Sequence, residues 1–192
     1  MTATPESFLR VGAVVLAAVI LQLSGLGPMR FFGGHPDLVP LAVAAVAIYA
    51  GSVTGAATGF AAGFVLDLAV GATMGASSLV LTAVGYAVGR YREVRDPAHG
   101  LMPIPVGAAA TLGFLFAFAS VSFMLDVGAS VSPLVLRDML VTTLLNALLA
   151  IPVFALCRRI LRPALVVDPF DRRRRRKAPI DSGPLGLRGL EV

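Results

Sequence analysis

Few side chains in this sequence could carry out a reaction or bind a metal ion. The two histidines, His35 and His99, lie in separate loops, and neither has an obvious catalytic partner close by in the sequence. A Ser–His–Asp triad or a metal site needs several such groups together. The one cysteine, Cys157, can form neither an internal disulfide nor a zinc cluster, and we interpret it as a small hydrophobic residue. We therefore expect no catalytic residue, no metal and no cofactor.

Acidic residues next to apolar segments are the remaining candidates, because an unpaired carboxylate inside a membrane is costly. Asp37, Asp67, Asp126 and Asp138 all lie close to the ends of apolar segments, where water and lipid headgroups reduce that cost. Asp37 and Asp138 begin such segments, and a carboxylate there interacts favourably with a helix dipole. We interpret these two as ordinary helix-terminal residues.

Asp67 differs from them because it ends an apolar segment, where the helix dipole disfavours a negative charge. It should therefore accept hydrogen bonds from a specific donor. The candidates are the side chains of Arg30 and Arg137 and the backbone N–H groups of the turn from Gly71 to Gly75. The sequence predicts a structural carboxylate at Asp67.

Asp67 continues a glycine series that runs through the segment before it. The series has a glycine at every fourth residue, with two aromatic residues beside it: Gly51, Gly55, Gly59, Phe60, Gly63 and Phe64. In water each interior glycine would weaken a helix by about 0.5–1 kcal/mol, whereas in a bilayer the backbone must pair within its own segment. Glycines on one helix face let another helix approach closely. That helix could belong to a partner or to this chain, and both alternatives remain open.

The composition explains why a bilayer is the expected environment. The chain has 192 residues, of which 57% are hydrophobic and 14% charged, whereas soluble domains have about 45–50% apolar and about 25% charged residues. The net charge of +5 and the pI of about 10.3 do not indicate nucleic-acid binding. The arginines stand at segment ends and in one tail, and do not follow a face of a soluble fold.

Six apolar segments, separated by turns, are predicted to be membrane-spanning helices of an all-α integral membrane protein. They cover residues 11–26, 37–50, 52–68, 76–89, 103–124 and 134–157. The second segment is short, with roughly fourteen residues against ~17–25 for a typical span. Only Gly51 and Ser52, without any charge, separate it from the third.

The basic residues orient these helices. If Arg10, the segment from Arg90 to Arg95, and all residues from Arg158 onward are cytoplasmic, about 14 of the 16 basic residues lie inside. Only Arg30 and Arg137 then lie outside. This arrangement needs an even number of spans before Arg90, so the second and third segments should be separate helices. We predict six transmembrane helices with both termini in the cytoplasm.

The chain divides into a transmembrane domain, residues 1–162, and a basic cytoplasmic tail, residues 163–192, which we expect to be disordered. The tail contains an unbroken basic run of Arg172, Arg173, Arg174, Arg175, Arg176 and Lys177. Such a run could contact anionic lipid, with about 1 kcal/mol per basic residue near the surface, or could only fix the topology. Its position directly after a membrane span argues against nucleic acid.

Several of these features also resemble a known family. They are His35-Pro36-Asp37-Leu38, the helix segment from Gly59 to Leu68 with its GF-x-x-G-x-x-x-D-L pattern, the turn Gly71-Ala-Thr-Met-Gly75, and Tyr86 in the next helix. In this order and spacing they are similar to the rod shape-determining protein MreD family. Each piece alone is a weak signal, since glycine pairs at this spacing are common in membrane proteins.

The resemblance implies a non-catalytic subunit of the cell-elongation machinery, in the bacterial cytoplasmic (inner) membrane. Such a subunit would help to maintain cell shape and organise lateral peptidoglycan synthesis. It would bind the transmembrane helix of MreC and lie near RodA and a class B penicillin-binding protein. Pro36 and Asp37 would form an outer-face motif, and Gly71 and Gly75 a motif turn. The family is also similar in fold to the substrate-binding membrane subunits of energy-coupling-factor transporters.

That similarity in fold keeps a second hypothesis open, a membrane component that binds a vitamin-sized substrate beside Asp67 and Tyr86. Such a pocket usually has several convergent polar or aromatic groups. The spans consist mostly of Ala, Val, Leu and Gly and contain no Trp. The sequence therefore favours an interaction subunit over a transporter component.

Overall fold

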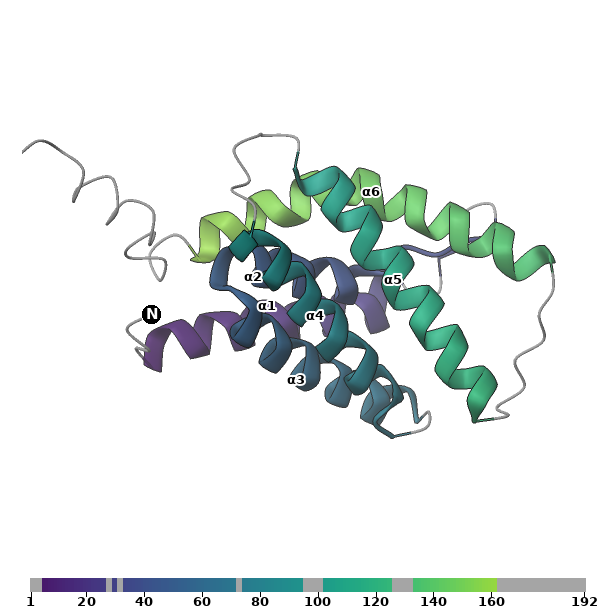
Figure 1. The fold of residues 1–192 in the computed structure, drawn as a ribbon, viewed down its shortest axis with the longest axis horizontal. Coiled ribbons are helices and arrows are strands. Elements are labelled where there is room, and N and C mark those ends of the chain that lie inside the picture. Colours follow the sequence, from purple (N-terminus) through teal and green to yellow (C-terminus); the bar gives the residue numbers. More distant parts are fainter. Residues whose placement is uncertain are drawn as a thin grey trace, which may run out of the picture.

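The computed structural model describes residues 5–26, 29–30, 33–71, 74–94, 102–125 and 133–161, which are mostly helical (Figure 1). The helices are α1 (Pro5–Leu21), which continues into a π-helical turn η1 (Gln22–Leu26), α2 (Leu38–Ala50), α3 (Ser52–Val70), α4 (Ala76–Val94), α5 (Pro103–Met124) and α6 (Pro133–Leu161). The predicted all-α fold is confirmed. Within the described residues, each of the six predicted segments corresponds to one α-helix.

The separation of the second and third segments is also confirmed. Gly51 stands between α2 and α3 with φ of 95°, a backbone conformation that glycine adopts at little cost. Its N–H donates to the carbonyl of Ala47 at 2.9 Å and so ends α2. A single long helix over this region is therefore excluded.

Helix α2 is the centre of the fold, and it contacts all five other helices. Every residue from Leu38 to Ile48 is buried. With 13 residues, α2 is about 20 Å long, against a hydrocarbon core of about 30 Å. A helix that is surrounded by protein can be this short, provided that the non-helical chain at its ends is also buried and hydrogen-bonded.

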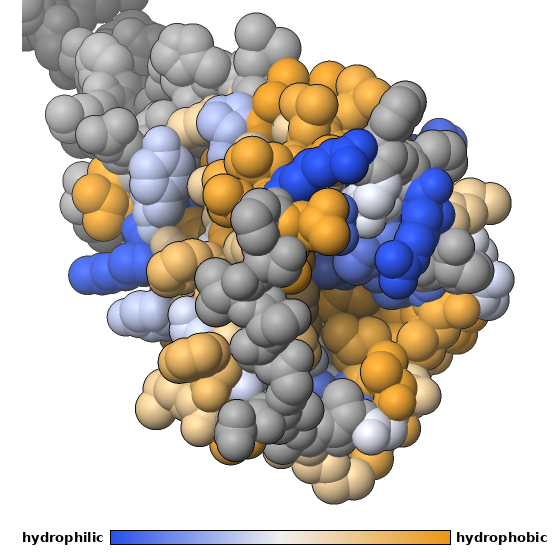
Figure 2. Space-filling model, turned by 90° about the vertical axis from the view of Figure 1, so that its right-hand side faces the viewer, coloured by the Kyte–Doolittle hydropathy of each residue, from blue (hydrophilic) through white to orange (hydrophobic). Residues whose placement is uncertain are grey.

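Successive helices run in alternating directions, so α1 begins and α6 ends at the same end of the molecule (Figure 1). We call it the arginine-rich end, because its described arginines are Arg10, Arg90, Arg92, Arg158 and Arg159. The opposite end, where α3 ends and α4 begins, carries Arg30 and Arg137. Figure 2 looks at this opposite end, where hydrophilic residues gather in one area and hydrophobic residues cover much of the remainder.

Three of the described helical stretches are long and apolar enough to cross a membrane: Ser52–Val70, Pro103–Met124 and Leu134–Leu161. Two more are apolar but shorter, Leu9–Gly25 and Leu38–Ala50. These helices fit the predicted membrane protein. That all six helices span the membrane stays a prediction.

Some predictions fall outside the residues that the structure describes. These include the tail with its basic run from Arg172 to Lys177, and two single residues, His99 and Asp126.

Candidate functional site

Helices α3 and α4 form an antiparallel pair that is packed through glycine. Gly55, Gly59 and Gly63 face α4, and a Cβ atom added to any of them would lie less than 3.0 Å from other atoms, mostly backbone atoms of α4. Gly85 and Gly89 of α4 meet the backbone of α3 in the same way. The two backbones therefore touch along the pair, and any larger side chain at these positions would force them apart.

This packing bears on the two alternatives that the sequence left open for the glycine series. The backbone of α4 already occupies the face formed by Gly55, Gly59 and Gly63, so a helix from another protein cannot use it while the pair is intact. Of the two alternatives, the described packing of these three glycines corresponds to contact within this chain. Gly51 has a different place, in the turn before α3.

Asp67 caps the first turn of α4. Its carboxylate is 2% exposed and accepts hydrogen bonds from the backbone N–H groups of Gly75 (2.9 Å), Ser77 (3.3 Å) and Ser78 (3.4 Å). The first N–H groups of a helix have no partner within it, and the helix dipole attracts an anion there. Of the donors considered from the sequence, the carboxylate uses the backbone of the turn. Both motif glycines there have positive φ, 66° at Gly71 and 94° at Gly75.

The arginine-rich end of the same pair has a matching arrangement. Glu93, near the end of α4, accepts hydrogen bonds at Oε1 from the N–H (3.0 Å) and the hydroxyl (2.6 Å) of Ser52, the first residue of α3. The neighbouring Arg92 donates to the carbonyl of Tyr49 at the end of α2, at 2.8 Å. The uncharged turn between α2 and α3 thus receives a carboxylate for one helix terminus and a guanidinium for the other, both from α4.

Each helix of the pair therefore caps the other. Asp67 at the end of α3 binds the start of α4, and Glu93 at the end of α4 binds the start of α3. The two ends differ in burial, because the Glu93 side chain is 39% exposed and also pairs with Arg90 at 3.1 Å. Glycine contacts and two carboxylate caps make α3 and α4 one rigid unit.

A second polar cluster surrounds the start of α2. Residues 33–37 reach α2 as non-helical chain, and Asp37 within it is buried. Asn146 of α6, which has 0% exposure, pairs with the backbone of Asp37. Its Oδ1 accepts from the Asp37 N–H at 2.9 Å, and its Nδ2 donates to the Asp37 carbonyl at 2.8 Å. The Nδ2 group also donates to the Thr111 hydroxyl of α5 at 3.0 Å.

Two further side chains bind backbone N–H groups of this segment. Thr142 of α6 accepts from His35 at 3.2 Å, and Gln22 of η1 accepts from Leu38 at 2.7 Å. We call the four side chains the polar cap of α2: Gln22, Thr111, Thr142 and Asn146. Non-helical backbone within a membrane protein must find its partners in the protein, and the polar cap supplies them.

Neither the polar cap nor the pair Arg92 and Glu93 was expected from the sequence. A signal was present, since Asn146 is the one amide side chain in the segment 134–157, and polar residues in spans commonly join helices. Of the outer-face motif, Pro36 and Asp37 are both buried. His35 lies beside them outside the helices, where partial burial, and then the charge of Arg30, lower its pKa below the ordinary 6.5.

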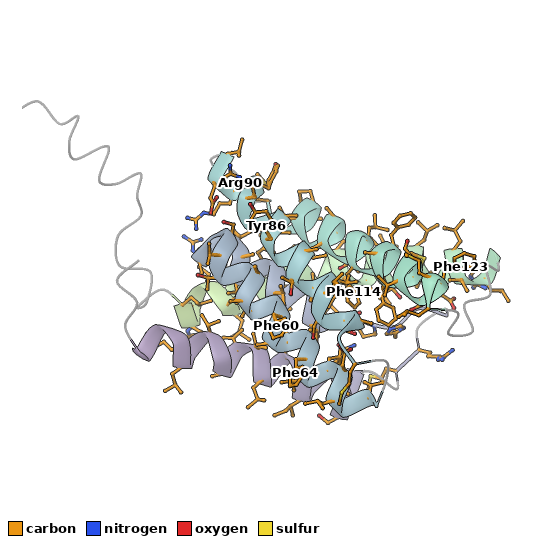
Figure 3. The ribbon with its side chains drawn as sticks, turned by 60° about the horizontal axis from the view of Figure 1, so that its bottom comes forward. Phe60, Phe64, Tyr86, Arg90, Phe114 and Phe123 are labelled. Atoms are coloured by element: carbon orange, nitrogen blue, oxygen red, sulfur yellow. The ribbon has the colours of Figure 1, made fainter. Side chains whose placement is uncertain are left out.

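The aromatic residues next to the glycines face outward. Phe60 and Phe64 are 57% and 46% exposed, and their rings stack with centroids 6.3 Å apart. Figure 3 shows them one turn apart on α3, away from Phe114 and Phe123 of α5. The same motif thus presents small residues to α4 and an aromatic pair to the surroundings of the protein.

An apolar groove lies on the other side of α4, against α5. It encloses about 450 Å³ and is lined by Val84, Ala87, Val88, Tyr91, Met102, Pro105, Val106, Ala109, Ala110 and Gly113. A Cβ atom added to Gly113 would meet nothing within 4 Å, in contrast to the glycines of α3. Neither Asp67 nor Tyr86 lines this groove, and Asp67 is saturated by backbone donors.

Many large apolar side chains of the described helices are exposed. Among the described residues there is no group of three or more His, Cys, Asp or Glu side chains that could bind a metal ion. The buried polar groups described above join helices to one another.

The family model described as rod shape-determining protein MreD matches residues 7–160. No curated protein and no solved structure matches the chain.

Proposed function

The chain belongs to the MreD family of rod shape-determining proteins, and on this premise we propose that it is a non-catalytic subunit of the bacterial cell-elongation complex. Family membership makes it a membrane protein with a role in rod shape. The proposal adds that it binds the transmembrane helix of MreC and helps to organise lateral peptidoglycan synthesis. RodA and a class B penicillin-binding protein would lie near it in the same complex.

In this proposal the protein crosses the cytoplasmic membrane six times with both termini inside. The distribution of described arginines supports this orientation, with five at the arginine-rich end and two, Arg30 and Arg137, at the other. The basic run from Arg172 to Lys177 would then follow α6 on the cytoplasmic side, where it could contact anionic lipid.

The exposed pair Phe60 and Phe64 is the observation that carries the proposed partner binding. Large aromatic side chains are frequent energetic centres of interfaces, because they bury much area with few rotatable bonds. Here they project from a helix that is fixed by glycine packing and by two caps. A rigid helix with a protruding aromatic pair suits docking of a second transmembrane helix, because little ordering entropy is lost on binding.

Co-purification from membranes tests this proposal. The full chain is co-expressed with MreC, and the MreC recovered per unit of chain is measured for the double variant Phe60→Ala/Phe64→Ala. We expect recovery to fall by about tenfold or more. The matched control is Phe116→Ala/Phe123→Ala on α5, whose side chains are 72% and 64% exposed and whose loss should leave recovery unchanged. Equal recovery for both double variants would contradict the proposed docking face.

The same preparation tests the transporter alternative. A vitamin-binding component would retain a small molecule without any companion polypeptide. The saturated carboxylate of Asp67, 2% exposed, does not favour such a ligand at that position. Mass spectrometry of the denatured sample would detect a retained metabolite, and its presence in stoichiometric amount, with no MreC, would replace the proposed function.

A further inference from the structure

An apolar groove remains open between α4 and α5. On α4 its lining runs from Val84 to Tyr91, which is about 10 Å of helix, or a third of the hydrocarbon thickness. A spanning helix would need contacts over most of about 30 Å. The volume of about 450 Å³ lies within the ~300–1,000 Å³ of small-molecule sites. The groove therefore fits a flexible chain better than a helix.

Charged residues stand close to one end of the groove. Tyr91 and Met102 are its lining residues nearest the arginine-rich end, where α4 ends and α5 begins. Arg90 and Arg92 flank Tyr91 on α4, and the Arg90 side chain is 62% exposed. Its Nη1 donates to Glu93 at 3.1 Å, but a guanidinium has five N–H donors and can bind a phosphate as well. An occupant with an apolar chain and an anionic head matches both parts.

We propose that the groove between α4 and α5 binds one acyl chain of an anionic phospholipid, with the lipid phosphate near Arg90. Hydrocarbon surrounds the protein on all sides, so apolarity alone would select no particular lipid. In this proposal the selection comes from Arg90, which precedes the lining residue Tyr91 on α4, and the shape of the groove fixes the chain. This site is separate from the aromatic pair of α3, and the proposal does not depend on partner binding there.

Native mass spectrometry of the full-length protein tests the proposal. The protein is purified in mild detergent, incubated with equal amounts of phosphatidylglycerol and phosphatidylethanolamine, and the lipid retained per chain is measured. We expect phosphatidylglycerol to be retained in preference. The double variant Ala109→Leu/Gly113→Leu fills the groove, and it should retain at least about tenfold less lipid with an unchanged thermal melting temperature, because Gly113 has open space around it.

Two further variants show whether lipid retention depends on the groove and on the charge of Arg90. Gly12→Leu adds the same side chain on α1, where a Cβ atom also meets nothing within 4 Å, and should retain lipid like the wild type. Arg90→Gln should remove the preference for phosphatidylglycerol while lipid binding remains.

Three results would overturn the proposal. One is equal retention by the wild type and the groove-filled variant, and another is retention of both lipids in proportion to supply. The third is loss of co-purifying MreC, with lipid unchanged, on filling the groove, since the groove would then be a helix-docking site. Replacing Arg172–Lys177 by serine should leave the retained lipid in place, and its loss there would assign the lipid to the tail.

Discussion

The pair α3 and α4 and the start of α2 bring backbone groups into contact in opposite ways. In the pair α3 and α4, contact is made by leaving side chains out, so that Gly59 and Gly63 meet the main chain of α4 directly. Around the start of α2, contact is made by putting side chains in, because Asn146 and its neighbours bind the N–H and C=O groups of residues 35–38. Both solutions satisfy the same requirement, a paired and densely packed backbone inside a membrane.

The difference lies in what each region can tolerate. A backbone contact has no side chain that can move away, so an added group must separate two helices. A side-chain hydrogen bond can be replaced, at some cost, by a water molecule or by a shifted rotamer. Substitutions in the glycine contact should therefore be the more damaging, and variants of the two regions can test this order.

The largest effect is expected for Gly59→Leu. The Cβ atom of the new side chain would overlap the carbonyl group of Leu81 in α4, and overpacking of this kind against backbone should cost about 4 kcal/mol or more. We expect loss of the folded monomer in size-exclusion chromatography after detergent extraction. Gly12→Leu is the matched control, because the same change on open α1 surface should leave stability unchanged. A folded, stable Gly59→Leu protein would contradict the described packing.

A smaller effect is expected for Asn146→Leu in the polar cap of α2. The change leaves the N–H and C=O of Asp37 without their partner, which should cost about 2–4 kcal/mol at this buried position. The measurement is the thermal or denaturant-induced unfolding of the purified protein. Lowered stability should come with faster hydrogen exchange at the backbone N–H groups of His35, Asp37 and Leu38.

Two threonines on the same helix provide graded controls for Asn146→Leu. Thr142→Val removes one bond, to the N–H of His35, and should have an intermediate effect. Thr143 donates only to the Met139 carbonyl of its own helix, at 2.7 Å, so Thr143→Val should cost least. If Thr143→Val destabilised the protein as much as Asn146→Leu, the polar cap would not be what holds residues 33–37.

The contrast also explains which parts of the structure could be predicted. The glycine contact is visible in the sequence because a helix repeats its face every three to four residues, so Gly55, Gly59 and Gly63 stand at a fixed spacing. The order of the helices followed from apolar runs and turn residues, but α1 begins earlier than predicted, at Pro5, and α4 and α6 continue beyond the predicted spans, to Val94 and Leu161. Which helix the glycines contact could not be read from their spacing, because it depends on how the helices are placed.

The polar cap gives no such local pattern. Asn146 meets Asp37 across 109 positions of sequence, and Arg92 meets Tyr49 across 43. Each is a single residue whose partner is a backbone group, and any residue has a backbone group. Only the tertiary arrangement decides which one is reached. The sequence could show that Asn146 needed a partner, but not that the partner was the start of α2.

The smallest effect is expected at Asp67, which combines the glycine contact with side-chain hydrogen bonding. It is therefore also the sharpest test of the comparison. It lies on the glycine face of α3, yet it acts by accepting bonds from Gly75, Ser77 and Ser78. Asp67→Asn keeps an acceptor oxygen and should cost about 1 kcal/mol, whereas Asp67→Leu leaves buried donors unpaired and should cost about 2–3 kcal/mol. Unfolding of the two purified variants measures this difference. Equal stability of both would mean that Asp67 contributes only by its size, and that glycine packing alone holds the end of the pair. A clear gap between them would mean that the end of a side-chain-free contact still needs a hydrogen-bond acceptor, because the first turn of α4 has N–H groups that packing cannot satisfy.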